Sequence, residues 1–200
     1  MEKNTVLEKE PLEKELKRIL HKKRYRQNIK KTVMLILCIL SSLVIIYAFF
    51  VPVLKIKNVH MGNFLKEGDI AAGICAGQYR QGDIIAFFYG KEILIKRVIA
   101  KAGDTVDIDE FGNVYVNEEI LDEDYLIEKI QGECSTSFPV RVPDGCLFVL
   151  NDDRSVPSDS RDEKIGCIDE KNVICRLMLR IYPFEHAGWI TGEERYEEES

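Results

Sequence analysis

An uncharged apolar run near the N-terminus constrains this chain most. Residues 32–54 read TVMLILCILSSLVIIYAFFVPVL, which is 23 residues without Asp, Glu, Lys or Arg. A helix rises ~1.5 Å per residue, so such a run spans roughly 35 Å and crosses a hydrocarbon core about 30 Å thick. A cleaved secretory peptide has an apolar stretch of only about 7–15 residues before a small-residue site. This run is longer and ends in bulky residues, which predicts a retained membrane anchor.

The charge differs in sign between the two sides of this run. Residues 1–31 carry a net charge of +6 and residues 32–200 carry −12, so the overall −6 hides an asymmetry. The basic segment HKKRYRQNIKK directly precedes the run, whereas Lys55 and Lys57 follow it. The positive-inside bias therefore predicts a single-pass type II protein, with a cytoplasmic N-terminus and an extracytoplasmic C-terminal part. We expect the basic segment to contact anionic membrane lipid, and the acidic remainder argues against nucleic-acid binding.

Beyond residue 54 the pattern changes from helical to strand-like. Runs rich in β-branched and aromatic residues, such as IIAFFYG, EILIKRVIA and CLFVL, are separated by turn sequences such as Gly103-Asp104. The late run KNVICRLMLRIYPF also favours a strand. We expect a mainly β ectodomain, a sandwich or partly closed barrel, on a single N-terminal transmembrane helix. The predicted organisation is a basic cytoplasmic arm at 1–31, an anchor at 32–54, an extracytoplasmic β domain at 55–192 and an acidic tail at 193–200.

The cysteine and histidine patterns predict neither a disulfide framework nor a metal site. Cys38 lies in the anchor, which leaves five cysteines in the ectodomain. Five cysteines cannot all pair within one chain, although a single disulfide remains a possibility. His60 and His186 follow the anchor without a neighbouring His or Cys, so no metal and no cofactor are expected. The three cysteines inside apolar runs are expected to pack as small hydrophobic side chains. The ectodomain cysteines are Cys75, Cys134, Cys146, Cys167 and Cys175, of which the last three are in apolar runs.

Four sequence blocks follow the anchor in a fixed order and carry a family resemblance. They are NVHMGNFLKEGDI, QGDIIAF, ILIKRVIAKAGDTVDI with GNVYVNEEILDEDY, and GCLFVLNDDRSVPSDSR. From Leu54 to Phe184 the chain resembles the type I signal peptidases, membrane-bound endopeptidases that remove signal peptides from secreted proteins. The resemblance implies a signal-peptidase-type β fold, acyl transfer by a serine–lysine dyad, and extended signal peptides or preproteins as partners.

The resemblance places the dyad base at Lys96. Lysine can take a proton from serine only if burial lowers its pKa towards neutrality. Lys96 fits this demand because it interrupts the apolar run Ile93-Leu94-Ile95. Without the resemblance, it reads as a lysine whose stem crosses a sheet edge and whose amine reaches water. The other residues that the resemblance implies are the ion pair Arg97 and Asp152, the supporting residues Asp159 and Arg161, and Met61 in substrate binding.

The nucleophile position departs from the family pattern. In the family a Ser-Met pair precedes a variable residue, then Pro-Thr-Leu, and after two more residues Gly-Asp. Here Met61, Leu65, Gly68 and Asp69 match, which puts His60 where the serine should be. Asn63 and Phe64 stand in place of the Pro-Thr pair.

The last block departs from the pattern as well. Its usual Gly-Asp-Asn-Arg opening begins here with Asn151, and the serine that normally steadies the lysine falls at Pro157, which has no hydroxyl. Ser158 is displaced by one residue, and strand alternation predicts that its side chain faces away from the lysine.

These substitutions lead to three functional hypotheses. The favoured one is a signal peptidase I-like membrane protein that engages signal peptides or exported proteins at the outer face of the membrane. Its hydrolysis is then lost or impaired, because His60 replaces the nucleophilic serine. One alternative is an active serine-type endopeptidase with substituted chemistry, such as His60 acting as a base for water. The other is a membrane-tethered chaperone or assembly factor for secreted or surface proteins.

Overall fold

The structure is a computed structural model that describes residues 3–57, 59–61, 65–75, 77–126 and 128–190. The chain divides into two compact units between Phe49 and Phe50. Each unit is described by itself below.

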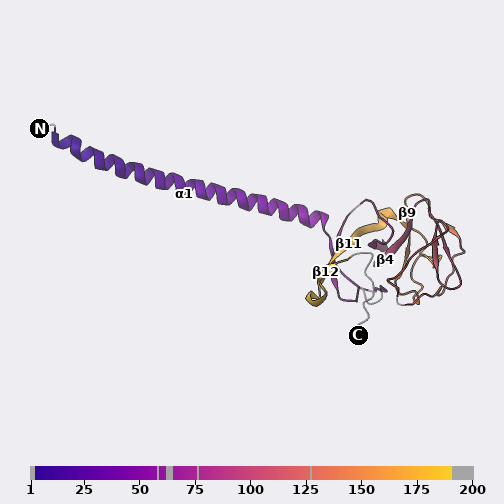
Figure 1. The fold of residues 1–200 in the computed structure, drawn as a ribbon. Coiled ribbons are helices and arrows are strands. Elements are labelled where there is room, and N and C mark those ends of the chain that lie inside the picture. The colour runs from indigo at the N-terminus through magenta and orange to yellow at the C-terminus, as the bar shows by residue number, and fades with distance from the viewer. Residues whose placement is uncertain (1–2, 58, 62–64, 76, 127, 191–200) are drawn as a thin grey trace. The chain divides into compact units, whose positions relative to one another are not determined.

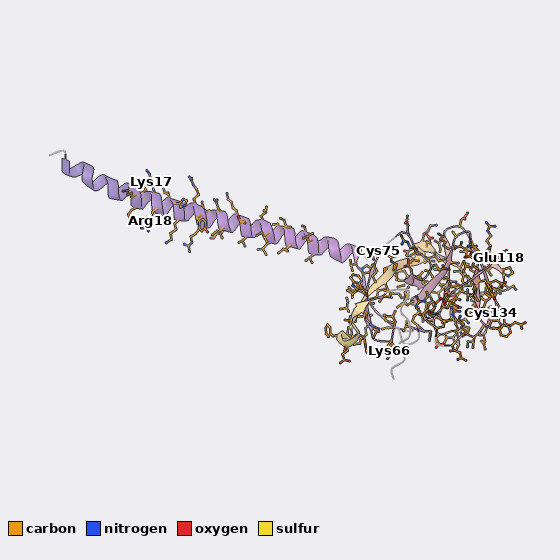
Figure 2. All side chains as sticks on the ribbon, in the orientation of Figure 1. Lys17, Arg18, Lys66, Cys75, Glu118 and Cys134 are labelled. Carbon is orange, nitrogen blue, oxygen red and sulfur yellow. The ribbon has the colours of Figure 1, made fainter. Side chains whose placement is uncertain are left out.

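The N-terminal unit is a single helix, α1 (Lys3–Phe50), drawn from indigo to magenta in Figure 1. It is the one helix of the described residues that is long and apolar enough to cross a membrane. The hydroxyls of Ser41 and Ser42 donate to the carbonyls of Cys38 and Ile39 at 2.9 and 2.8 Å. Such bonds satisfy polar groups within an apolar span. The side chains of Lys17 and Arg18 project from the helix (Figure 2).

The helix ends before the apolar run does. Val53 and Leu54 belong to strand β1 (Val53–Lys55), so the last residues of the predicted anchor are not helical. Pro52 lies between the two elements, and proline lacks the amide hydrogen that a continuing helix would need.

The C-terminal unit is mainly β, as the sequence predicts. Its larger sheet has eight strands in the order β1-β2-β11-β3-β4-β9-β10, with β12 paired to β11, and all its pairs are antiparallel. The smaller sheet has the order β7-β6-β5-β8. The late run KNVICRLMLRIYPF supplies β11, which confirms its assignment as a strand. The remaining strands of the larger sheet are β2 (Ile70–Ile74), β3 (Ile84–Tyr89), β4 (Glu92–Lys101), β9 (Cys146–Leu150), β10 (Ile168–Asp169), β11 (Val173–Tyr182) and β12 (Gly188–Trp189).

The smaller sheet is inserted between β4 and β9 along the chain. Its strands are β5 (Thr105–Ile108), β6 (Val114–Val116), β7 (Glu119–Ile120) and β8 (Val140–Arg141). Two short 3-10 helices, η1 (Glu170–Asn172) and η2 (Phe184–His186), flank β11. Because this insertion leaves at the end of β4 and returns at the start of β9, those two strands remain neighbours (Figure 1).

The cysteines of the apolar runs pack with the core, as predicted. Cys175 is buried in one hydrophobic cluster, and Cys146 and Cys167 pack against a second. Burial raises the pKa of Cys167 to about 11 and that of Cys175 to about 12, so both thiols stay protonated at neutral pH. All the cysteines are free thiols in the structure.

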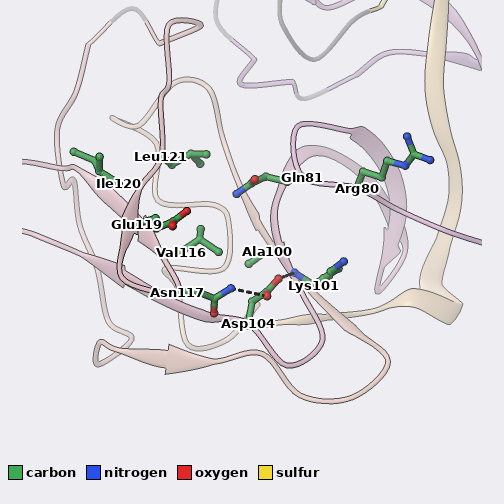
Figure 3. A pocket seen from close by; sticks show the side chains of 10 residues that line it. All are labelled: Arg80, Gln81, Ala100, Lys101, Asp104, Val116, Asn117, Glu119, Ile120 and Leu121. Carbon is green, nitrogen blue, oxygen red and sulfur yellow. Dashed lines mark hydrogen bonds between the residues drawn. The ribbon is translucent and has the colours of Figure 1, made fainter.

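A cavity of about 390 Å³ lies where the end of β4 meets the small sheet (Figure 3). Asn117 donates to the Asp104 carboxylate at 2.9 Å at its floor. None of the site residues that the sequence predicts lines this cavity. Its lining residues are Arg80, Gln81, Ala100, Lys101, Asp104, Val116, Asn117, Glu119, Ile120 and Leu121.

Candidate active site

Strand β4 positions two buried cations on its opposite faces. Lys96 pairs in register with Ile85 of β3, and Arg97 pairs with Ile84 of β3 and Leu150 of β9. Side chains alternate along a strand, so the two residues point to opposite faces of the sheet. Lys96 has 0% of its surface exposed and Arg97 has 2%. The interruption of the apolar run by Lys96 therefore does correspond to a buried amine.

The Lys96 amine faces the segment that follows β9. Its Nζ lies 3.5 Å from the Oγ of Ser158. Burial lowers the pKa of Lys96 to about 8, while the charge of Asp159 raises it and that of Arg161 lowers it further. An ordinary lysine has a pKa of about 10.4, so this amine releases its proton far more readily near neutral pH.

His60 lies in the electrostatic neighbourhood of Lys96. Its half-buried imidazole has a lowered pKa because burial and the charge of Lys96 both disfavour the imidazolium, while Asp153 opposes them. The His60 carbonyl accepts a hydrogen bond of 3.1 Å from the Asp153 amide, which links the two blocks. Met61 follows it and is fully buried. The substituted pair Asn63 and Phe64 lies outside the described residues.

The orientation of the Ser158 side chain differs from the prediction. The sequence predicts that its side chain faces away from the lysine, and this is wrong, because its hydroxyl is in contact with the Lys96 amine. Residues 151–161 form irregular turns rather than a strand, so two-residue alternation does not apply to them. Pro157 stands at the position of the family's helper serine and has no hydroxyl. The hydroxyl in contact with Lys96 is that of the next residue, Ser158.

Asn151 also lies close to the Ser158 hydroxyl. Its Nδ2 donates to the Val156 carbonyl at 2.8 Å and lies 3.4 Å from the Ser158 Oγ. Asn151 is fully buried, and its Oδ1 has no hydrogen-bond partner among the described residues. The residue that replaces the family's glycine thus brings an amide donor to the serine.

Arg97 and Asp152 form the buried ion pair that the resemblance implies. The guanidinium donates to the two carboxylate oxygens at 2.8 and 2.6 Å. Its central carbon also lies 3.9 Å from the centre of the Tyr125 ring. The Tyr125 hydroxyl donates to Glu123 at 2.7 Å, and Glu123 pairs with Arg154. The sequence predicts the first pair but not the roles of Glu123 and Tyr125, for which the block GNVYVNEEILDEDY offers no separate indication.

Arg161 holds the turn segment together. It forms a buried ion pair with Asp159 at 2.8 Å, and it donates to the carbonyls of Arg154 and Val156 at 2.9 and 3.0 Å. Asp159 in turn accepts the Asn151 amide at 3.0 Å. Both residues are within 1% of full burial. The charges of Asp159 and Arg161 act on the pKa of Lys96. Their hydrogen bonds also hold the loop that carries Ser158 in place.

One edge of β4 is open next to the lysine. Strand β3 pairs with β4 from Glu92 to Arg97, whereas β9 pairs with it only from Arg97 to Lys101. Among the described strands, the segment from Glu92 to Ile95 therefore has a neighbour on one side. Such a half-paired segment can accept an extended peptide by main-chain hydrogen bonds.

The site therefore combines a buried amine of lowered pKa, a hydroxyl, a half-buried imidazole and a segment of β4 that has a partner on one side among the described strands. The described residues contain no group of three or more His, Cys, Asp or Glu side chains that could hold a metal ion. The chemistry that this arrangement supports is proton transfer between an amine and a hydroxyl beside a bound chain.

Comparisons with known proteins identify the family of this chain. The family model for signal peptidase, peptidase S26, matches residues 27–182. Signal peptidase IB of Staphylococcus aureus is 32% identical over 162 residues, which cover 71% of this chain and 83% of the relative. The probable thylakoidal processing peptidase 2 of Arabidopsis thaliana, a chloroplastic protein, is 36% identical over 92 residues, or 46% of this chain and 23% of the relative.

A crystal structure of a signal peptidase I from Enterococcus faecalis V583 is 28% identical. It covers 50% of this chain and 97% of its own, with a TM-score of 0.43. By the extent of the family match and the identity to the staphylococcal enzyme, this chain belongs to the signal peptidase family, peptidase S26.

Proposed function

We propose that this protein binds signal peptides or exported proteins in extended conformation at the outer face of the membrane. Hydrolysis from the family's nucleophile position is lost or impaired, because His60 supplies an imidazole where a hydroxyl is needed. The proposal includes the type II orientation, in which α1 anchors the ectodomain outside the cytoplasm.

The observation that carries this proposal is the open edge of β4 beside Lys96. In the part of the chain that the structure describes, the segment from Glu92 to Ile95 has one strand neighbour, and it ends at the buried amine. A peptide that pairs with this segment gains main-chain hydrogen bonds irrespective of whether a nucleophile is present. Binding can therefore persist when acyl transfer at the family position does not.

The loss of hydrolysis at His60 follows from the chemistry of its side chain. An imidazole that attacks a peptide carbonyl forms a tetrahedral intermediate, from which the imidazole departs far more readily than the peptide amine. The attack on an unactivated amide is then reversed before the peptide bond breaks. Removing one member of a catalytic unit removes most of the rate that depends on the unit.

The test compares binding with cleavage in the full-length protein in detergent micelles. A fluorescent signal peptide is titrated by anisotropy, and its products are followed by mass spectrometry. We expect saturable binding to the wild type and cleavage at least about 100-fold faster in His60→Ser, because the substitution restores the hydroxyl beside Lys96. His186→Ser, which changes the exposed histidine of η2, is the matched control and should leave both readouts unchanged.

Two results would contradict the proposal. One is the absence of binding to the wild-type protein. The other is wild-type cleavage as fast as that of His60→Ser, which would mean that the family nucleophile position does not limit hydrolysis.

A further inference from the structure

We propose that Ser158 and Lys96 form a serine–lysine dyad in place of the family's own, in which Ser158 is the nucleophile for slow acyl transfer from bound peptides. The inference goes beyond peptide binding. It rests on the proposed function only for the delivery of the peptide, and the reactivity of Ser158 does not depend on it.

The geometry brings one hydroxyl to the buried amine. The Ser158 Oγ lies 3.5 Å from the Lys96 Nζ, slightly beyond the range of a tight hydrogen bond. Distances between a nucleophile and its base are often looser in the free enzyme than in the reacting complex. Lys96 is fully buried, whereas Ser158 is half-buried, so the hydroxyl is the member of the pair that an incoming carbonyl can reach.

Asn151 orients the hydroxyl. The Val156 carbonyl can only accept a hydrogen bond, so the Asn151 group at 2.8 Å from it must be the NH₂ rather than the amide oxygen. The same NH₂ lies 3.4 Å from the Ser158 Oγ. Because this amide presents a donor, the serine oxygen acts as its acceptor, and the hydroxyl hydrogen can point at the amine once Lys96 is neutral.

With the surrounding charges included, the pKa of the Lys96 amine is low enough for it to act as a base. Burial is the main cause that lowers the pKa of Lys96 to about 8. The charge of Asp159 raises this pKa, and the charge of Arg161 lowers it. Burial and the charge of Lys96 lower the pKa of the His60 imidazole, which favours its neutral form beside the amine. At pH 8 about half of the Lys96 population is then neutral and able to accept a proton.

The reaction balances with water as the only co-reactant. As the Ser158 Oγ forms a bond to the scissile carbonyl carbon, its proton moves to the neutral Lys96 Nζ. The carbon–nitrogen bond then breaks, and the Lys96 ammonium protonates the departing amine. Water subsequently attacks the Ser158 ester with Lys96 as its base, which releases the acid and restores both side chains.

The experiment uses a fluorophosphonate on the full-length protein in detergent micelles. Attack by the Ser158 Oγ forms an oxygen–phosphorus bond and expels fluoride, and peptide mapping by mass spectrometry locates the adduct. We expect the wild type to be labelled at Ser158, with labelling at least about 50-fold slower in Lys96→Met because the base is removed. Ser155→Ala is the matched control, since Ser155 is exposed and donates to Asp153, and its labelling should stay within about twofold of the wild type.

The pH dependence separates a nucleophile from a hydroxyl that merely holds the lysine. The labelling rate at Ser158 should rise with pH and level off above about 8, because only the neutral amine accepts the proton. Ser158→Cys keeps a nucleophile of similar size, and its alkylation by iodoacetamide should depend on Lys96 in the same way.

The proposal is overturned if wild-type protein forms no adduct at Ser158, or if the adduct forms equally fast in Lys96→Met. Neither result depends on peptide binding, because the fluorophosphonate needs no strand partner. Failure of the proposed function would instead appear in the anisotropy titration.

Discussion

At the level of the single side chain, burying the Lys96 amine in a sheet lowers the stability of the folded protein at pH values where lysine is normally protonated. Its folded pKa of about 8 lies below its ordinary value of 10.5, so the unfolded chain binds more protons between these values. Stability therefore rises with pH across this window. We expect a gain on the order of 2 kcal/mol from pH 8 to pH 10 in the wild type that is missing in Lys96→Met.

Urea unfolding of the detergent-solubilised protein, followed by tyrosine fluorescence at each pH, measures this gain. The relevant quantity is the difference between wild type and Lys96→Met, in which the titration of all other groups cancels. A difference that stays constant from pH 8 to pH 10 would show that the amine is not desolvated as described.

A second side-chain prediction concerns the Arg97–Asp152 pair. Asp152→Asn keeps the shape but leaves the Arg97 guanidinium buried without its counter-charge, so we expect a loss of about 3 kcal/mol in the free energy of unfolding. Asp169→Asn is the matched control, because the Asp169–Lys171 pair is solvent-exposed and such pairs contribute about 0–1 kcal/mol. Equal losses in the two variants would refute the assignment of a structural role to the buried pair.

The same residues show what the sequence could and could not predict. The burial of Lys96 follows from the family resemblance, whereas the residues around it alone predict an amine that reaches water. The contact between Lys96 and Ser158 follows from neither, because alternation was assumed for a segment that is not a strand. Its turns are held by Arg161 donating to distant carbonyls, and no local pattern in the sequence encodes such bonds.

At the level of strands and turns, the β runs were predictable because β-branched and aromatic residues concentrate in them. The end of the helix was harder to predict than the strands. The apolar run continues from α1 into β1 without a change in composition, and Pro52 is the one residue at the junction that marks the break. Hydrophobicity alone does not distinguish the last turn of a membrane-spanning helix from the strand that follows it.

Gly132 tests how the turn segment is supported. It has a φ of +67°, and a Cβ there would lie 2.5 Å from the Arg154 carbonyl oxygen and 2.7 Å from the Arg161 Nη1. Gly132→Ala should therefore displace the Arg161 bonds and cost about 3 kcal/mol or more, measured by urea unfolding. Gly145→Ala has a similar φ of +70° but open space around the added Cβ, so about 1 kcal/mol is expected. Similar costs at both sites would mean that the crowding at Gly132 is relieved cheaply.

The open edge of β4 makes a prediction about the bound peptide. In a strand that pairs along one edge, alternate amides point at the partner strand. A signal peptide that is N-methylated at alternate residues in one register should lose at least about tenfold in affinity, whereas methylation in the other register should cost little. Fluorescence anisotropy with the two methylated peptides measures this. Equal affinities for both peptides would exclude strand addition as the mode of binding.

At the level of the chain as a whole, the charge asymmetry predicts the orientation in the membrane. The arm before the apolar run carries +6 and the rest of the chain −12, so the positively charged end is expected to stay in the cytoplasm. The family supports a membrane-anchored protein, and the orientation itself calls for a direct measurement.

Cysteine accessibility in intact cells provides that measurement. Cys75 is exposed in the ectodomain (Figure 2), so a membrane-impermeant maleimide should label it before the cells are opened. In a Cys75→Ser background, a cysteine introduced by His21→Cys on the exposed arm should react only after lysis, because the basic residues that follow it keep the arm inside. Labelling in the opposite order would place the ectodomain in the cytoplasm. In that case the protein could not meet signal peptides at the outer face of the membrane, and the proposed function would be excluded regardless of the chemistry at Lys96.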